Sequence, residues 1–578
     1  MKILFNHIGY APGDEKALLI EAPEKTAWKE LALIVLPDGR AVWRGNAEFA
    51  GGVTGWSPGP WWRVDVSAVR APGRYALRWV TADAAGQSEG FTIAENILGH
   101  PVVSEILFYF KSQRCAGIYD RADRSAKRVG DGAVRDVHGG WYDASGDTSK
   151  YLSHLSYANF MNPQQTPLVV WVLARAWHLY RAAGAHPYFL ERLQAEALHG
   201  ADWLMRMQDP AGFWHVTVFD KWTKDPAQRE LCSYRTQKGD KYADYQAGWR
   251  QGGGMAIAAL ALASTVGDGA DFRAADYLGA ARKGFAHLVE HGTAYLDDGQ
   301  ENIIDDTCAL LAAVELQAAE LAETAGGETK PMFVLRTLAA ELDRRAASLL
   351  ARRRETDGVI WLAADAAGER SWFHASDAGL PMVALQRLAE VHPAHPRAAA
   401  AFELAATLVR AQVTLGRVPN NPFGYPPHWV KAPGGTGRAQ WFYPHDNPSG
   451  YWWQGENARL GSLAAAAWAV VRQSGGDVGL DAAALRWVDW ILGANPFDRC
   501  MLHGRGRNNP VYEEHYHNAP GGVCNGITSG FTDENDIAFA PEPFASDPAQ
   551  KWRWAEQWLP HGAWLLYALA LRETSGRA

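Results

Sequence analysis

The spacing of apolar positions divides the chain into two parts. Up to about residue 96, apolar and polar residues alternate in short runs that are separated by turn residues. Strands are expected at 31–36, 62–66, 73–80 and 90–93, with a turn signal at Pro37-Asp38-Gly39 after the first. Short alternating strands over this length predict a small all-β sandwich spanning residues 1–96.

From residue 97 the apolar spacing becomes helical. Val102, Val103, Ile106, Leu107 and Phe110 share one helix face. Similar segments predict further helices near 167–183, 190–207, 252–265, 277–290, 302–323, 333–351, 377–390, 397–413, 458–473, 482–493 and 552–572. The longest loops, 116–166, 209–250, 414–457 and 494–551, have the length typical of functional segments. Twelve helices with such loops predict an all-α (α/α)6 barrel over residues 97–578, with its site at one end.

Composition narrows the class of partner. The 578 residues are 47% hydrophobic and 21% charged with a net charge of −8, which is ordinary for a globular protein and argues against nucleic acid. No apolar run approaches the ~20 residues of a membrane span. The start of the chain lacks the roughly 7–15 apolar residues of a signal peptide. Five scattered cysteines without a C-x-x-C predict buried thiols, so we expect a cytoplasmic protein without a membrane partner. The oligomeric state stays open.

Tryptophan is unusually abundant. The chain has 26 copies, and many lie in polar stretches rich in Gly and Pro, such as Trp141, Trp429 and Trp452. Flat aromatic faces stack on the C–H faces of sugar rings, so some copies suit a carbohydrate cleft. The alternative is core packing, which we expect for most of them.

Two aspartates lie four positions apart in Gly139-Gly-Trp-Tyr-Asp143-Ala-Ser-Gly-Asp147. Glycine permits the backbone angles that turn both carboxylates towards one point. An inverting glycosidase needs a base that deprotonates a water molecule, and two neighbouring carboxylates can hold that water from two directions. A calcium-binding loop is the alternative, because aspartates at this spacing can also ligate a hard cation.

A third acid lies near the C-terminus, where Trp552, Trp554 and Trp558 flank Glu556 at the start of the last predicted helix. Apolar surroundings raise the pKa of a carboxyl group, as a general acid near neutral pH requires. The alternative is a solvated glutamate in the first helical turn, favoured by the helix dipole.

Together these segments resemble glycoside hydrolase family 9. Further matching stretches are Asn6–Pro12, which resembles the opening of an immunoglobulin-like domain, and Tyr245–Gly254, His374–Pro381 and Leu492–Pro496. The resemblance implies an immunoglobulin-like N-terminal sandwich, an (α/α)6 barrel and inversion at the anomeric carbon. It also implies that Asp147 is the catalytic base, that Asp143 helps to hold the water and that Glu556 is the acid.

One departure from the common cellulases of the family concerns the aspartates. Three residues separate Asp143 from Asp147 instead of two, and the stretch Lys150–His154 follows. This pattern resembles exo-acting members that include exo-β-D-glucosaminidases. It implies release of single sugars from the non-reducing end of short β-1,4 oligosaccharides, with glucosamine from chitosan oligomers favoured. The alternatives are a β-glucosidase or endoglucanase acting on cello-oligosaccharides or cellulose, and a non-catalytic carbohydrate-binding protein.

Several polar and aromatic residues are candidates for contacting the oligosaccharide. Glu456 is the expected partner of a sugar amine, because an acidic pocket favours an ammonium group. An acid in the first turn of a predicted helix, such as Asp305 or Asp306, can instead serve as a cap or dipole partner. The full set of expected substrate-binding residues is Trp141, Tyr142, Asp306, Trp452, Glu456 and His515. His515-x-His517 lacks an evident third ligand, so no metal or other cofactor is expected.

Overall fold

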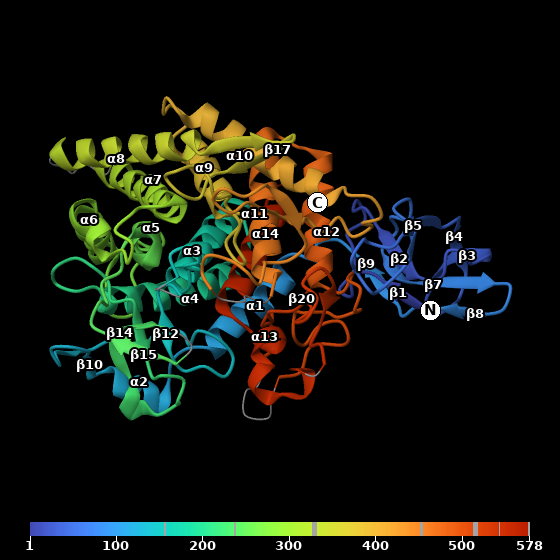
Figure 1. Cartoon of the computed structure of the whole chain (residues 1–578), viewed down its shortest axis with the longest axis horizontal. Helices are drawn as coiled ribbons and strands as arrows, with labels where there is room; N and C mark the ends of the chain where they lie inside the picture. Colours follow the sequence, from blue (N-terminus) through green and yellow to red (C-terminus); the bar gives the residue numbers. More distant parts are fainter. Residues whose placement is uncertain are drawn as a thin grey trace.

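The computed structural model describes residues 1–154, 158–235, 238–325, 332–450, 455–512, 518–542 and 544–575. The N-terminal strands form a β-rich unit at one side of a larger helical body (Figure 1). The last strand of this unit ends at Ile93 and the first helix, α1, begins at His100.

The N-terminal unit consists of two antiparallel sheets. Their inward faces enclose a core that includes Leu18, Ile20, Leu33, Leu77 and Phe91. The four predicted strands are confirmed as β3, β6, β7 and β9, whereas five others were not predicted. One sheet has the order β1 (Lys2–Leu4), β2 (Ala17–Glu21), β6 (Trp61–Asp65), β5 (Glu48–Gly51). The other has the order β4 (Ala41–Arg44), β3 (Trp28–Val35), β7 (Gly73–Thr81), β8 (Ala85–Gln87), and β9 (Phe91–Ile93) also pairs with β7.

Six helices form a closed inner ring, because each contacts the next and the last returns to the first. They are α3 (Thr166–Ala182), α5 (Gly254–Ala263), α7 (Ile303–Ala325), α9 (Leu380–Val391), α11 (Asn457–Ser474) and α14 (Leu559–Glu573). Six outer helices each pack mainly against one inner helix, in the same order: α4 (Pro187–Met207), α6 (Ala274–His291), α8 (Met332–Ala351), α10 (Ala398–Gly416), α12 (Val478–Ile491) and α1 (His100–Ser112). This pairing is that of an (α/α)6 barrel. Two short helices, α2 (Gly117–Asp123) and α13 (Trp552–Ala555), lie outside it.

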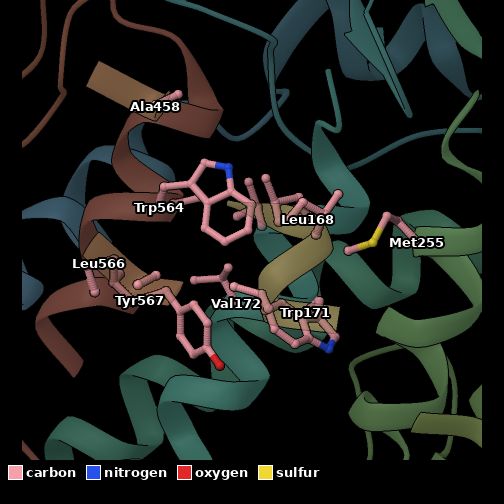
Figure 2. Close-up of a cluster of buried hydrophobic side chains, with 14 of the residues drawn as sticks. Leu168, Trp171, Val172, Met255, Ala458, Trp564, Leu566 and Tyr567 are labelled. Atoms are coloured by element: carbon pink, nitrogen blue, oxygen red, sulfur yellow. The ribbon is translucent and has the colours of Figure 1, made fainter. Parts of the chain in front are cut away.

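The centre of the ring is filled by large apolar side chains (Figure 2). Trp171 on α3 meets the ring of Tyr567 on α14 edge-on, with 5.2 Å between the ring centroids. Every residue of α14 from Leu559 to Leu571 is buried, so this helix is covered on all sides. The expectation that most tryptophans pack in cores is confirmed, because sixteen of the 26 are buried: Trp56, Trp61, Trp141, Trp171, Trp177, Trp203, Trp214, Trp249, Trp361, Trp429, Trp468, Trp487, Trp490, Trp554, Trp558 and Trp564.

The β-rich unit is attached firmly to the barrel. Trp56 packs against Trp441, with 5.0 Å between the ring centroids, and also against Trp490 of α12. The Asn6 side-chain amide donates a hydrogen bond of 2.7 Å to Asp489 Oδ1, also on α12. Apolar packing and buried polar contacts therefore both join the two parts.

The long loops hold short strands that the sequence did not predict. One sheet joins the two loops 116–166 and 209–250, so these segments form a single structure beside the ring. It contains β11 (Val134–Arg135), β10 (Ala126–Arg128), β14 (Glu230–Arg235), β13 (Thr217–Phe219) and β12 (Lys150–Tyr151), and β15 (Asp240–Tyr242) pairs with β14. Three further hairpins are β16 (Arg353–Thr356) with β17 (Val359–Leu362), β18 (His428–Val430) with β19 (Arg438–Gln440), and β20 (Thr528–Ser529) with β21 (Ile537–Ala538).

The cysteines and the most apolar long helix test two expectations drawn from composition. All five cysteines are buried and unpaired, as predicted. Within the described residues, α10 is the one helix long and apolar enough to span a membrane, and half of its apolar window is buried. Because α10 packs against α9 and α11 in the barrel, it has the environment of a core helix.

Candidate active site

Backbone pairing brings the three predicted catalytic acids together. Ala144 and Trp558 form an antiparallel bridge, and the Ser145 N–H donates a 2.8 Å hydrogen bond to the carbonyl of Gln557. The loop that carries the two aspartates therefore runs alongside the segment that begins at Glu556. More than 400 residues of chain separate the two segments, so only the closure of the helix ring places them side by side.

Glu556 does not lie in a helix, contrary to the expectation. The predicted helix near 552–572 is divided into α13 and α14, and Glu556 between them has extended backbone angles of φ −63° and ψ 132°. Its carbonyl accepts a 2.9 Å hydrogen bond from the Asn525 N–H instead of continuing the helix. The alternative of a first-turn glutamate is therefore wrong. Burial and the charges of Asp143 and Asp147 raise the pKa of Glu556 well above its usual range.

Asp143 is nearly enclosed, with 4% of its surface exposed. Its Oδ1 accepts a 3.0 Å hydrogen bond from the Trp558 indole N–H. Burial and the charge of Asp147 nevertheless raise the pKa of Asp143 well above its usual range. His154 Nε2 lies 3.8 Å from Asp143 Oδ2, and burial lowers the pKa of His154 to about 3, so this imidazole is neutral.

Asp147 is more exposed than Asp143 and ionises more readily. Burial and the charge of Asp220 raise its pKa to about 6, whereas the backbone N–H groups of Ser149 and Thr148 oppose this rise. These two N–H groups donate to Asp147 Oδ1 over 2.8 Å and 2.6 Å respectively. The site therefore combines Asp147, whose pKa is about 6, with two carboxyl groups whose pKa is raised well above its usual range. Such a separation is how paired carboxyls acquire base and acid roles.

A buried cluster of charged residues packs against the loop that carries Asp143 and Asp147, called the aspartate loop below. The Lys150 ammonium lies 2.7 Å from Asp123 Oδ2, and Arg229 Nε lies 2.6 Å from Asp123 Oδ1. Lys150 also donates to the carbonyl oxygens of Val137 and Gly139, at 2.8 Å and 2.7 Å. These contacts fix the chain on both sides of the catalytic aspartates, and no sequence motif predicted them.

The two aromatic candidates beside the aspartates differ in burial, since Trp141 is enclosed whereas Tyr142 is half-buried. Trp141 is fully buried against Gly200, and its indole N–H donates a 2.7 Å hydrogen bond to Glu196. The Tyr142 hydroxyl instead accepts a 3.1 Å hydrogen bond from the Ala116 N–H. The expectation that Trp141 stacks on substrate is corrected, because its ring belongs to the core between helices.

Two acidic candidates for substrate binding are occupied by neighbouring side chains. Asp306 is 3% exposed, and its carboxylate binds three side chains on and just after α8. Asp306 Oδ1 accepts from Arg345 at 2.9 Å, and Oδ2 accepts from Ser348 at 2.6 Å and from Arg352 at 2.7 Å. Both oxygens are therefore used to join α7 to α8, and Asp306 is corrected to a structural residue.

Glu456 is likewise enclosed, with 2% of its surface exposed. It accepts hydrogen bonds from the Tyr425 hydroxyl at 2.9 Å, from His428 at 3.1 Å and from Arg459 at 3.0 Å. Burial opposes its ionisation, but these partners outweigh burial and lower the pKa of Glu456 to about 2. With its negative charge already compensated inside the protein, Glu456 is corrected from an amine-binding residue to a structural one.

Two further substrate-binding candidates, Trp452 and His515, lie outside the described residues, as does His517. Within the described residues, no group of three or more His, Cys, Asp or Glu side chains is arranged to hold a metal ion.

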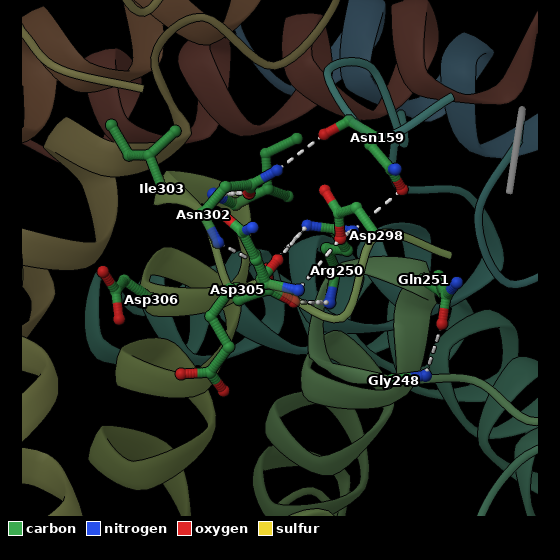
Figure 3. A network of polar contacts seen from close by, with 12 residues as sticks. Asn159, Gly248, Arg250, Gln251, Asp298, Asn302, Ile303, Asp305 and Asp306 are labelled. Atoms are coloured by element: carbon green, nitrogen blue, oxygen red, sulfur yellow. Dashed lines mark hydrogen bonds and ion pairs between the residues drawn. The ribbon is translucent and has the colours of Figure 1, made fainter. Parts of the chain in front are cut away.

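Asp305 serves the N-terminus of α7, which was the alternative considered for it (Figure 3). Its Oδ2 accepts a 2.8 Å hydrogen bond from the Asn302 N–H and a 3.1 Å hydrogen bond from Arg250. Arg250 also donates to Asp298 and Asn159, each at 2.8 Å. Arg250 therefore connects the loop before α3 to the start of α7.

Residues 100–524 match the family model described as Glycosyl hydrolase family 9. Because this span exceeds half of the chain, the protein belongs to this family of glycosyl hydrolases. The matched span contains Asp143 and Asp147 but ends before Glu556, whose assignment rests on the geometry of the site.

Known proteins similar to this chain act on glucans or share its fold. The xyloglucan-specific endo-β-1,4-glucanase BoGH9A of Bacteroides ovatus is 26% identical over 331 residues, which cover 52% of this chain and 52% of that protein. The match thus spans about half the length of the curated relative. A Bacteroides ovatus GH9 structure has 18% identity and a TM-score of 0.64, covering 99% of this chain and 98% of its own. A thermostable endoglucanase mutant from Alicyclobacillus acidocaldarius has 19% identity and a TM-score of 0.64, covering 98% and 99%. At these identities the two structures show the fold alone.

Proposed function

We propose that this glycosidase hydrolyses β-1,4-linked glucan chains with inversion at the anomeric carbon. The observation that carries the proposal is the separation of ionisation within the site. The pKa of Asp147 is about 6, whereas burial and neighbouring acids hold the pKa of Glu556 well above its usual range. One ionised and one protonated carboxyl group at a single site is the combination that glycoside hydrolysis needs.

In the proposed reaction, the Asp147 carboxylate accepts a proton from a water molecule as that water attacks the anomeric carbon. Asp143, oriented by the Trp558 indole, holds the same water from a second direction. Glu556 donates its proton to the glycosidic oxygen, so the leaving sugar departs as a neutral alcohol. Neutral His154 beside Asp143 adds no positive charge that would weaken the base.

The glucan substrate is supported by the curated relative, whose name describes cleavage of β-1,4 bonds in xyloglucan. The experiment that tests this substrate incubates the protein with carboxymethylcellulose, xyloglucan and cello-oligosaccharides and measures reducing ends. Release of reducing ends from at least one of them is expected. Absence of release from all three, with hydrolysis of another polymer, would remove glucan as the substrate.

An exo-β-D-glucosaminidase is the second candidate, because three residues separate Asp143 from Asp147 and Lys150–His154 follow. The loss of Glu456 as the amine-binding residue weakens this candidate, since Arg459 compensates its charge and Tyr425 and His428 occupy its oxygens. Parallel incubation with cellobiose and with deacetylated chitobiose separates the two candidates. Viscometry on soluble chitosan and carboxymethylcellulose then distinguishes internal cleavage, which thins the polymer rapidly, from release of single end sugars.

A cytoplasmic location belongs to the same proposal and rests on the cysteine pattern. It fits short imported oligosaccharides better than an insoluble polymer. Cell fractionation followed by activity measurement tests it, and activity confined to the exterior would contradict it.

A further inference from the structure

Asp220, directly after β13, lies fully buried under the aspartate loop. Its Oδ1 accepts hydrogen bonds from the Ser149 hydroxyl and from the Trp222 N–H, each at 2.9 Å. Its Oδ2 accepts a hydrogen bond from the Thr148 hydroxyl. One carboxylate thus gathers two consecutive residues of the aspartate loop and the turn that follows β13.

The two residues held by Asp220 also hold the proposed base. The hydroxyl groups of Thr148 and Ser149 are bound to Asp220, while their backbone N–H groups donate to Asp147 Oδ1. The Thr148–Ser149 stretch is therefore held through its side-chain hydroxyls by the carboxylate of Asp220 and through its backbone N–H groups by the carboxylate of Asp147. Displacement of Asp220 would move the donors that orient Asp147.

Asp220 is itself held by a rigid neighbour. Arg229 Nη1 lies 3.8 Å from Asp220 Oδ2 and also donates to the Thr148 carbonyl. The same guanidinium is bound to Asp123, which pairs with Lys150. Because all of these charged groups are buried, their positions are strongly constrained.

We propose that Asp220 is a positioning residue for the catalytic base: its carboxylate fixes the Thr148–Ser149 stretch that orients Asp147. This inference rests on the proposed function, because it assumes that Asp147 is the base. None of the sequence motifs pointed to Asp220.

The charge of Asp220 acts among several other ionisable groups. Asp143 and Glu556 face Asp147 from the site, Tyr151 faces it from β12, and Lys224 faces it from the turn after β13. After burial, Asp220 is the strongest influence that raises the pKa of Asp147 to about 6. Removing its charge would therefore lower this pKa and weaken the base.

The test uses Asp220→Asn, which preserves the shape and an acceptor oxygen but removes the charge. The acidic limb of kcat/KM against pH reports the pKa of the base in the free enzyme. We expect this limb to move to lower pH by about one unit, with a lower plateau. The control is Asp225→Asn in the same loop, where the exposed Asp225 caps a short turn at 226–228, and its limb should coincide with that of the wild type.

A folded Asp220→Asn variant whose acidic limb stays at the wild-type pH would overturn the proposal, even if its rate fell. Thr148→Val provides a second test, because it removes the hydroxyl link to Asp220 and leaves the charge of Asp220. A fall in kcat with an unchanged acidic limb is expected, and an unchanged kcat would also overturn the proposal. Asp147→Asn separates the two hypotheses: if this variant keeps the wild-type rate, the assigned base is wrong and the proposed mechanism fails with it.

Discussion

Asp489 gives the protein a pH-dependent stability that can be measured without any substrate. It lies on α12 at the junction with the β-rich unit, with 8% of its surface exposed, and accepts the hydrogen bond from Asn6. Burial raises the pKa of Asp489 to about 8, the Asn6 hydrogen bond opposes this rise, and the charge of Asp14 adds to it. The positive charges of Arg572 and Arg486 act in the opposite direction.

The sign and size of the effect follow from proton linkage. An unfolded aspartate has a pKa of about 3.9, so between about pH 4 and pH 8 the folded protein binds more protons than the unfolded chain. The contribution of Asp489 to stability is fully present below pH 4 and is lost as pH rises towards 8. The greatest slope is ~1.4 kcal/mol per pH unit, which gives on the order of 5 kcal/mol over the whole interval.

Asp489→Asn keeps the side-chain shape and an acceptor for Asn6 but does not titrate. Urea unfolding at pH 5, 7 and 9 would measure the free energy of unfolding of both proteins. We expect the difference, variant minus wild type, to grow more positive with pH, because the other titrating groups cancel. Asp38→Asn on the exposed β3–β4 turn serves as the control and should show no such trend. A difference that is independent of pH would refute the reasoning.

Four further changes test the site and the core. Glu556→Gln should slow hydrolysis of natural oligosaccharides by about 10²–10⁴-fold in steady-state assays while sparing aryl glycosides whose leaving group needs no proton; equal losses on both would contradict an acid role. Asp147→Asn should lose a similar factor on both kinds of substrate, and selective loss on one kind would argue against a base. Trp564→Ala should lower the free energy of unfolding by about 3–5 kcal/mol in urea titrations, because Trp564 is fully buried and its indole N–H donates a hydrogen bond to Asp377. A loss below 1 kcal/mol would contradict this expectation, because it would mean that neighbouring side chains fill the space left by the indole. Glu315→Gln should cost about 3 kcal/mol by the same measurement, since it removes one of the two carboxylates paired with the buried Arg387 and leaves only Glu390; an unchanged midpoint would contradict a stabilising role for the Glu315–Arg387 pair.

The helices of the ring could be predicted well from the sequence, because the periodic spacing of apolar residues that indicates a helix lies within each segment. Each ring helix repeats apolar residues over several turns, so the expected segments near 167–183 and 458–473 differ by only a residue or two from α3 and α11. The short strands of the long loops span two to six residues, which is too short for an alternating pattern. The break after α13 was missed because Trp554 and Trp558 fit helical spacing. Pro560 in the first turn of α14 was the available signal for a new helix start.

The catalytic acids could be proposed from the sequence because each lies in a short and distinctive segment. The substrate-binding residues could not, because the role of a polar or aromatic side chain depends on distant partners. Glu456 accepts hydrogen bonds from Tyr425 and His428, about 30 residues away in the chain. Trp141 is drawn into the core by Gly200, whose missing side chain leaves room for the indole. Neither contact has a signal in local spacing.

The central claim is that Asp147 and Glu556 act as base and acid in an inverting hydrolysis. The most direct test is a proton NMR time course of the first products released from a β-linked oligosaccharide, recorded before the anomers equilibrate. Attack by water on the face opposite the leaving group predicts that the α-anomer appears first. Initial appearance of the β-anomer would show retention through a covalent intermediate and would contradict the assignment of these two residues.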